Sequence, residues 1–257
     1  MSIVWNDIFQ LPVSALADGR RITKTMLVQQ AALTKHEQKT LDKVKKLEHF
    51  ATVSKSTTKM LPVINDERDI QSIIFLCCEM SSATQAVAEV ARLIHKCFPN
   101  PVVIMWEANE KISISVSLTR KSLAEQGAVV IERLEALRAF DPEAAIWKDY
   151  LSDIAYPHMP QSDLLTYLMA LSDRTAKADA ISAIGMYPRC KDAETPYLML
   201  LLGQLRDTQA EINALRLQYR DKEATLAESS RLRMALKEKE RERDKLATEI
   251  KELCNGR

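Results

Sequence analysis

Residues 204–255, QLRDTQAEINALRLQYRDKEATLAESSRLRMALKEKERERDKLATEIKELCN, form a stretch without glycine or proline. Charged side chains fill 23 of its 52 positions, and apolar side chains recur among them at steps of about seven. The apolar positions are Leu205, Ile212, Leu215, Tyr219, Leu226, Leu232, Leu236, Leu246, Ile250 and Leu253. This pattern predicts one long helix whose narrow apolar seam needs a partner helix to cover it.

The seam is irregular in the middle. Leu236 follows Leu226 by ten residues, which is seven plus three, and Lys239 falls on a seam position. A three-residue insertion overwinds or interrupts a coiled coil locally. The irregularity favours a weak homotypic coil, or a seam made for a particular partner, over a long rigid rod.

The charge of the chain is unevenly distributed. The net charge is +1, yet residues 20–60 carry ten lysines and arginines against only three acids, Glu37, Asp42 and Glu48. An anionic partner is therefore expected to bind this segment.

The cysteines and the apolar runs indicate a cellular location. Five cysteines show no regular spacing, and two of them, Cys77 and Cys78, lie side by side in an apolar run. No secretion signal and no apolar span of about 18 residues is recognisable. We expect a cytoplasmic protein without a membrane partner and with reduced thiols.

The order of the remaining elements predicts the fold class. Thr34 and Glu37 match a capping box, so a helix should begin after Thr34 and run to about Leu47. Strands are expected at residues 70–78, 102–106, 111–118 and 128–131, and an amphipathic helix before residue 98. We predict an α+β or α/β fold, a mixed sheet with flanking helices. The expected domains are an α/β domain at 1–135, a helical connector at 136–195 and a coiled-coil helix at 196–257.

One predicted strand, residues 111–118, alternates strictly between apolar residues and serines. Ser113, Ser115 and Ser117 share one face, which we expect to be wet, while the apolar face is buried. Arg120 and Lys121 follow the serines. These two cations are candidates for contact with a phosphate, although an ordinary solvent face explains the pattern as well.

The predicted helix after Thr34 carries a row of lysines. Lys35, Lys39, Lys43 and Lys46 are spaced by four, four and three residues, which places them along one helix face. With Arg20, Arg21 and Lys24 nearby, the row is a candidate nucleic-acid contact. A solvated face opposite Leu41, Val44 and Leu47 accounts for it equally well.

Catalytic signatures are weak. A metal-dependent nuclease needs two carboxylates and usually a lysine two residues beyond the second. Asp69 and Glu79 flank the apolar strand, but no lysine follows Glu79 in the required place. The four histidines share no ligand spacing, and His95 is expected to be a helix-end residue favoured by the helix dipole. With five glycines and no phosphate-binding loop, we predict neither a metal nor a cofactor.

Several segments together resemble a bacterial family, domain of unknown function 4391. The matching pieces are Leu33-Thr34-Lys35, Leu61-Pro62, Ile70 to Glu79, Ile94 to Pro101 with its Pro-x-Pro turn, and Ser117 to Lys121. Members of that family sit in gene clusters beside helicase-like ATPases, DNA methyltransferases and restriction subunits. The resemblance implies a restriction-modification or related anti-phage setting and does not imply an activity.

The sequence therefore favours a non-catalytic assembly subunit. Its α/β domain is expected to dock on a helicase-like ATPase or a DNA methyltransferase, or on their DNA, while the C-terminal helix holds the assembly or pairs with a second copy. Two alternatives stay open. One is a diverged nuclease that uses Asp69 and Glu79, and the other is a dimeric DNA-binding module.

Overall fold

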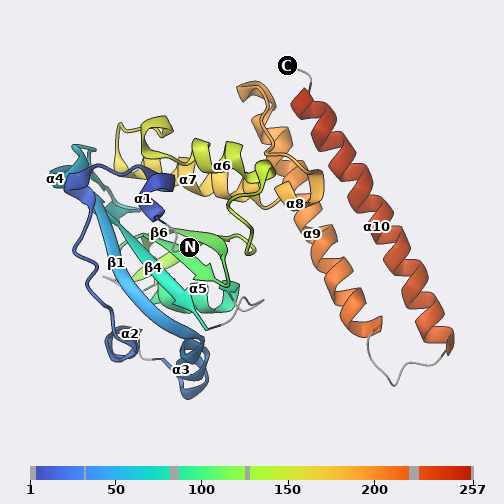
Figure 1. The fold of residues 1–257 in the computed structure, drawn as a ribbon, viewed down its shortest axis with the longest axis horizontal. Helices are drawn as coiled ribbons and strands as arrows, with labels where there is room; N and C mark the ends of the chain where they lie inside the picture. Colours follow the sequence, from blue (N-terminus) through green and yellow to red (C-terminus); the bar gives the residue numbers. More distant parts are fainter. Residues whose placement is uncertain (1–3, 32, 82–86, 125–127, 220–225, 256–257) are drawn as a thin grey trace. The chain divides into compact units, whose positions relative to one another are not determined.

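The structure, a computed structural model, describes residues 4–31, 33–81, 87–124, 128–219 and 226–255. The chain divides into two compact units, Met1–Ala176 and Lys177–Arg257. The boundary lies inside helix α7 (Leu164–Ala178), within the segment predicted to be a helical connector. Each unit has its own element order, and Figure 1 traces both along the chain.

The first unit is built on a mixed five-stranded sheet, which confirms the predicted fold class. The strands lie in the order β1-β4-β5-β6-β7 across the sheet, with β4 and β5 parallel and the other neighbours antiparallel. Their bounds are β1 (Val44–Ser54), β4 (Ser72–Met80), β5 (Val102–Ala108), β6 (Lys111–Lys121) and β7 (Val129–Ala136). Parallel neighbours need a crossover connection. Helix α5 (Val87–Lys96) lies between β4 and β5 in the sequence and belongs to this crossover.

Shorter elements complete the first unit. A two-stranded ribbon pairs β2 (Val63–Ile64) with β3 (Asp69–Ile70). The remaining helices are α1 (Trp5–Phe9), α2 (Lys24–Ala31), α3 (Lys35–Thr40), α4 (Lys55–Thr58) and α6 (Lys148–Asp153), with 3-10 turns η1 (Val13–Ala15), η2 (Leu41–Lys43), η3 (Ala145–Trp147) and η4 (Tyr156–His158).

Side chains pack against both faces of the sheet. Leu76 and Cys78 of β4 belong to the same buried cluster as Val90 and Ile94 of α5. Phe75 alternates to the opposite face, where its ring meets Phe9 of α1 edge-on at 5.3 Å between ring centres. The central strands are therefore covered on both sides, as their apolar sequence predicts.

The helix that begins after Thr34 is shorter than expected. The capping box is present, because Thr34 Oγ1 accepts from the Glu37 amide and the Glu37 carboxylate accepts from the Thr34 amide. The helix nevertheless ends at Thr40, and β1 begins at Val44. The prediction of a helix to Leu47 is wrong because Val44 and Leu47 are buried by pairing and packing in the sheet. Ser82 and Gln85 also match a capping box in the sequence, and they lie outside the described residues.

The serine face of β6 is also different from the prediction. Ser113, Ser115 and Ser117 are at most 1% exposed, so both faces of this strand are buried. His95 reaches this face from α5, with its two ring nitrogens each 2.9 Å from the Oγ of Ser115 or Ser117. The Trp106 indole donates to Ser115 Oγ at 2.9 Å. The wet-face prediction is wrong because His95 of α5 supplies a polar partner to Ser115 and Ser117, while Ser113 Oγ donates to the Leu137 carbonyl at 2.6 Å.

His95 is not the dipole-favoured cation that its place near a helix end suggests. Burial lowers its pKa to about 3, so the ring is neutral at neutral pH. A neutral ring can donate from one nitrogen and accept at the other, and two serine hydroxyls suit either arrangement. The residue is an internal structural partner of β6.

A strap, defined here as residues 16–22, lies antiparallel along the outer edge of β1. Backbone hydrogen bonds join Ala17 to Phe50, His49 to Arg20 and Ile22 to Leu47, at 2.8, 2.9 and 2.8 Å. The bridges Leu16–Ala51 and Arg21–Glu48 fix its register. The strap therefore covers one edge of the sheet and fixes where α2 begins.

The second unit is a helical hairpin. Its main helices are α9 (Thr195–Tyr219) and α10 (Leu226–Asn255), preceded by α8 (Ile181–Ile184) and η5 (Asp192–Glu194). The two long helices pack along each other, and both contribute to one buried cluster that includes Leu198, Leu205 and Ile250. The C-terminal region is helical as predicted. The sequence predicted one long helix whose seam needs a partner, and the structure has two helices, α9 and α10, which cover each other.

Candidate functional site

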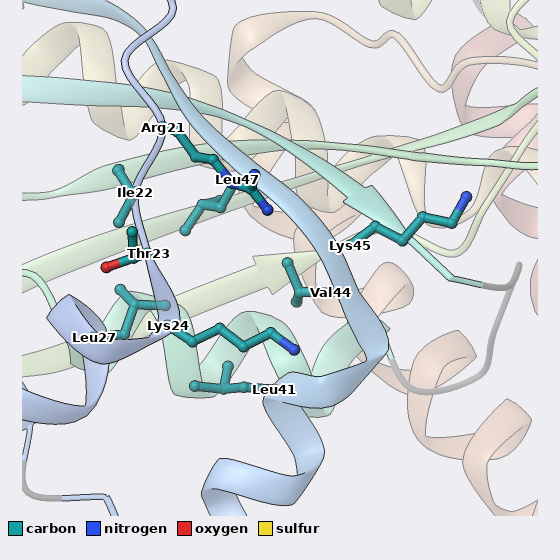
Figure 2. Close-up of a pocket in the computed structure, with 9 residues that line it drawn as sticks. All are labelled: Arg21, Ile22, Thr23, Lys24, Leu27, Leu41, Val44, Lys45 and Leu47. Carbon is teal, nitrogen blue, oxygen red and sulfur yellow. The ribbon is translucent and has the colours of Figure 1, made fainter.

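A pocket of about 230 Å³ opens beside the start of β1 (Figure 2). We call it the cationic pocket. Its lining comes from the end of the strap, α2, η2 and β1, and consists of Arg21, Ile22, Thr23, Lys24, Leu27, Leu41, Val44, Lys45 and Leu47. Thus the strap brings residues 21–27 against residues 41–47 and creates the site.

The floor of the cationic pocket is aliphatic. Leu27, Leu41, Val44 and Leu47 are buried members of the core between the sheet and α5. Ile22 packs against the same cluster while remaining partly exposed. A ligand in the pocket would therefore touch the fixed hydrophobic core of the unit.

The rim of the cationic pocket carries Arg21 and Lys24, whereas the side chain of Lys45 extends away from the other lining residues (Figure 2). Lys24 Nζ lies 3.2 Å from Asp42, and Lys45 Nζ lies 2.9 Å from Glu79. Arg21 forms no ion pair with any described residue. Exposed ion pairs contribute only about 0–1 kcal/mol, so Lys24 can exchange the Asp42 carboxylate for that of a ligand at little cost.

The predicted lysine row does not exist as one face. Lys35 and Lys39 lie on α3, Lys43 is in η2, and Lys46 is on β1. The single-face geometry is therefore wrong, for the same reason that the helix ends early. Lys45, which lies outside the predicted row, is the lysine of β1 among the residues that line the cationic pocket.

Ion pairs neutralise many cations of this region. The pairs are Lys24–Asp42, Lys43–Glu89, Lys45–Glu79, Lys46–Glu48 and Lys96–Glu37. Within the described part of the chain, six cations of residues 20–60 have no such partner: Arg20, Arg21, Lys35, Lys39, Lys55 and Lys59. The first four are the predicted nucleic-acid contacts that stay available to an external anion.

Arg120 and Lys121 lie apart from the other predicted cations. They are at the end of β6 that pairs with Val129 and Val130, whereas Lys46 lies at the opposite end of the sheet. A strand of nine residues spans roughly 30 Å. Lys121 Nζ donates to the Asn65 carbonyl at 2.6 Å, and Arg120 donates to the Lys121 carbonyl. Both cations therefore bind nearby backbone carbonyls, and they are not part of the surface around the cationic pocket.

The two carboxylates of the nuclease hypothesis are separated. Asp69 precedes β4 and Glu79 lies near its other end, roughly 25–30 Å away along the strand. Glu79 pairs with Lys45, and Asp69 accepts from the Gln71 amide. Among the described residues, no three His, Cys, Asp or Glu side chains come together as metal ligands would.

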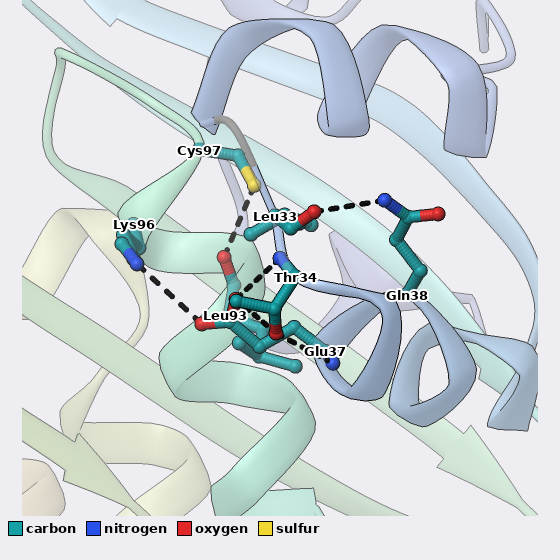
Figure 3. A network of polar contacts seen from close by, with 7 residues as sticks. All are labelled: Leu33, Thr34, Glu37, Gln38, Leu93, Lys96 and Cys97. Atoms are coloured by element: carbon teal, nitrogen blue, oxygen red, sulfur yellow. Dashed lines mark hydrogen bonds and ion pairs between the residues drawn. The ribbon is translucent and has the colours of Figure 1, made fainter.

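A second depression, of about 330 Å³, lies between α3 and α5 and is lined by His36, Glu37, Thr40, Glu89 and Arg92, among others. Figure 3 shows the neighbouring polar network, in which Lys96 lies 3.4 Å from the Glu37 carboxylate. The Thr34 amide and hydroxyl, together with Lys96, hold the pKa of Glu37 below its usual range. This network holds α3 against α5.

The predicted seam of the hairpin is covered unevenly. Leu205, Ile212 and Ile250 are buried, whereas Tyr219 is 46% exposed. The partly buried seam residues are Leu215, Leu232, Leu236, Leu246 and Leu253. The side chain of Leu226 lies outside the described residues. Coverage is thus densest beside α8 and declines toward the end of α9.

Ion pairs join the two helices beside the seam. Arg216 lies 2.7 Å from Glu240, and Lys239 lies 2.6 Å from Glu211. The carboxylates of Glu211 and Glu242 raise the pKa of Lys239. The lysine at a predicted seam position is therefore used in holding α10 to α9.

Comparison with known proteins gives one family match. The family model described as Domain of unknown function (DUF4391) matches residues 9–242, which include parts of both units. No curated protein and no solved structure matches the chain. None of the helices in the described ranges combines the length and the apolar character that a bilayer crossing requires.

Proposed function

Because this chain belongs to the DUF4391 family, a family without an assigned activity, we propose a function from its geometry: it is a non-catalytic accessory subunit that binds another protein through its helical hairpin. The proposed setting is a restriction-modification-like anti-phage system, with a helicase-like ATPase or a DNA methyltransferase as the partner. The setting rests on the family resemblance, and the binding surface rests on the hairpin.

The uneven seam is the observation that carries this proposal. Helix α9 has 25 residues and α10 has 30, so they are roughly 38 and 45 Å long. Over the part that includes Leu215, Leu232 and Leu236, the seam stays partly exposed. Two helices can cover only one side of each other, so a third helix laid along this groove would bury the remaining apolar surface.

Substitutions on α10 test the proposal with a matched control. Leu232 and Leu236 lie on the seam, whereas Met234, between them in the sequence, is 73% exposed on the outer side of the helix. The chain is co-expressed with a helicase-like ATPase and with a DNA methyltransferase, the two partner classes of the proposal, and co-elution is measured. Leu232→Glu combined with Leu236→Glu should abolish co-elution, and Met234→Glu should preserve it.

Three controls fix the interpretation. Circular dichroism must show that the double variant keeps its helices. Sedimentation of the parent chain alone identifies a second copy as the occupant of the groove, as the dimeric-module hypothesis requires. Co-elution that survives in the folded double variant would refute binding through the seam.

Contact with nucleic acid is a second candidate function, favoured by four of the predicted contact residues, which are exposed and have no described ion-pair partner. Arg20, Arg21, Lys35 and Lys39 are all exposed and lie in a segment with a large excess of positive charge. Cations that contact phosphates release counterions, so binding should weaken steeply with salt.

The salt dependence tests this candidate. Replacing all four cations by Gln should flatten the slope of log K against log salt by roughly 0.9 for each lost phosphate contact. The control variant removes four other exposed cations of the same unit, Lys55, Lys59, Lys111 and Lys148. Equal effects of the two variants, or none from either, would rule out a dedicated nucleic-acid surface here.

A further inference from the structure

We propose that the cationic pocket binds a short acidic segment of a protein partner, with one large aliphatic or phenyl side chain in the pocket and a neighbouring carboxylate on Arg21. The pocket belongs to the Met1–Ala176 unit and shares no residue with the hairpin. The inference therefore stands independently of binding through the seam.

The size of the pocket limits the ligand to a small group. Its volume is about 230 Å³. An apolar cavity of roughly 150 Å³ accepts a benzene molecule, and sites for drug-sized ligands start at roughly 300 Å³. The pocket thus has room for one leucine-sized or phenyl side chain and an adjoining polar group.

The floor of the pocket favours an amino-acid side chain over a nucleobase. Leu27, Leu41 and Leu47 supply aliphatic surface, and none of the described residues that line the pocket is aromatic. Proteins that hold unpaired bases generally stack them on aromatic side chains. An aliphatic or phenyl side chain needs only apolar contact, which these residues provide, and each buried CH₂ gains about 0.8 kcal/mol.

The rim of the pocket favours a carboxylate. The lysine on its rim, Lys24, already holds a carboxylate, that of Asp42. Arg21 is exposed and has no ion-pair partner among the described residues. Its guanidinium can bind a carboxylate through two parallel hydrogen bonds, and this geometry makes it the anchor for an incoming acidic side chain.

Titration of the full chain with short peptides tests this assignment. The probe is the capped tripeptide acetyl-Glu-Leu-Glu-amide, followed through the methyl resonances of Leu27, Leu41, Val44 and Leu47. Acetyl-Gln-Leu-Gln-amide removes the charge, acetyl-Glu-Ala-Glu-amide removes the apolar group, and thymidine 5′-monophosphate represents nucleic acid. The first peptide should bind at least about tenfold more tightly than each of the other three probes. Only this peptide has both an apolar side chain for the floor of the pocket and a carboxylate for Arg21 on its rim.

Variants separate the pocket from general charge. Arg21→Gln should weaken binding of the acidic peptide about tenfold, the loss expected for one charge-assisted hydrogen bond. The backbone bridge from residue 21 to Glu48 does not need the guanidinium, so the fold should persist and is checked by thermal unfolding. Lys55→Gln, an exposed cation in the same unit, should leave binding unchanged.

Three results would overturn the assignment. They are methyl resonances that no peptide shifts, tighter binding of thymidine 5′-monophosphate than of the acidic peptide, and equal weakening by Lys55→Gln and Arg21→Gln. The Leu232→Glu and Leu236→Glu variant should bind the acidic peptide like the parent. That outcome distinguishes a failure of the hairpin proposal from a failure of this one.

Discussion

The contact between β6 and α5 buries polar side chains, whereas the helical hairpin leaves apolar side chains exposed. In the first, His95, Ser115 and Ser117 are at most 1% exposed, and each finds a hydrogen-bond partner. In the second, Leu217 and Met234 are 70% and 73% exposed. A sheet covered by a helix can enclose polar groups completely, whereas two helices share only one mutual face. Polarity alone would therefore predict too much exposure for the polar side chains of the first region and too much burial for the apolar side chains of the second.

The largest expected effect separates the buried part of the hairpin from its outer side. Ile250 is fully buried beside α8 and α9, so Ile250→Ala should lower the free energy of unfolding by about 2–5 kcal/mol. Met234→Ala, on the same helix but exposed, should change it by less than about 0.5 kcal/mol. Denaturant unfolding followed by circular dichroism measures both. Similar values for the two would mean that α10 is not packed as described.

The second prediction concerns the polar network, whose stability depends on pH. The unfolded chain protonates His95 below about pH 6.5, while the folded chain resists protonation down to a pKa of about 3. The unfolding free energy should therefore fall as pH drops through this window, by at most about 1.4 kcal/mol per pH unit from this residue.

Comparison of variants isolates that contribution. His95→Gln should cost stability at pH 7 but should show a shallower decline between pH 6.5 and 4. His158→Gln, at an exposed position, should keep the slope of the parent. If the unfolding free energy of His95→Gln depended on pH as steeply as that of the parent, protonation of His95 would not be what destabilises the folded chain.

A smaller effect is expected where α3 is held by its capping box. Thr34→Ala removes the acceptor for the Glu37 amide and should cost about 1 kcal/mol. Lys35→Ala, one residue later and exposed, serves as the control and should be nearly neutral. Equal destabilisation by the two changes would remove the capping box as the explanation.

The smallest expected effects come from exposed ion pairs, in both units alike. Double-mutant cycles on Lys24–Asp42 and Arg216–Glu240 should each give a coupling energy of about 0.2–1 kcal/mol that shrinks with added salt. A coupling above about 2 kcal/mol in the hairpin alone would mean that charge, and not the apolar seam, holds α9 to α10.

Local signals in the sequence predicted the local structure well. The apolar, β-branched runs became β4 and β5, and the capping box at Thr34 formed as expected. What followed the cap was decided by distant residues, because Val44 and Leu47 pack in the core beside β4 and α5. A local helix signal cannot report such a contact.

The candidate sites depended even more on tertiary structure. The serine alternation correctly indicated a strand, but nothing within it could report that both faces are buried or that His95 of α5 meets Ser115 and Ser117. The seven-residue repeat predicted a partner helix without revealing that the same chain provides it. Residues 21–27 and 41–47 are brought together by the strap, so the cationic pocket had no contiguous motif.

The strap on β1 has a consequence for self-assembly. An uncovered edge strand offers a row of unpaired amides and carbonyls to any passing chain, and proteins usually block such edges. Here the backbone of residues 16–22 takes that place by hydrogen bonding to Leu47, His49 and Phe50. A protease cut that releases the strap would turn an eleven-residue strand into a template for intermolecular pairing. Residues 16–22 thus act as a built-in guard against fibre growth.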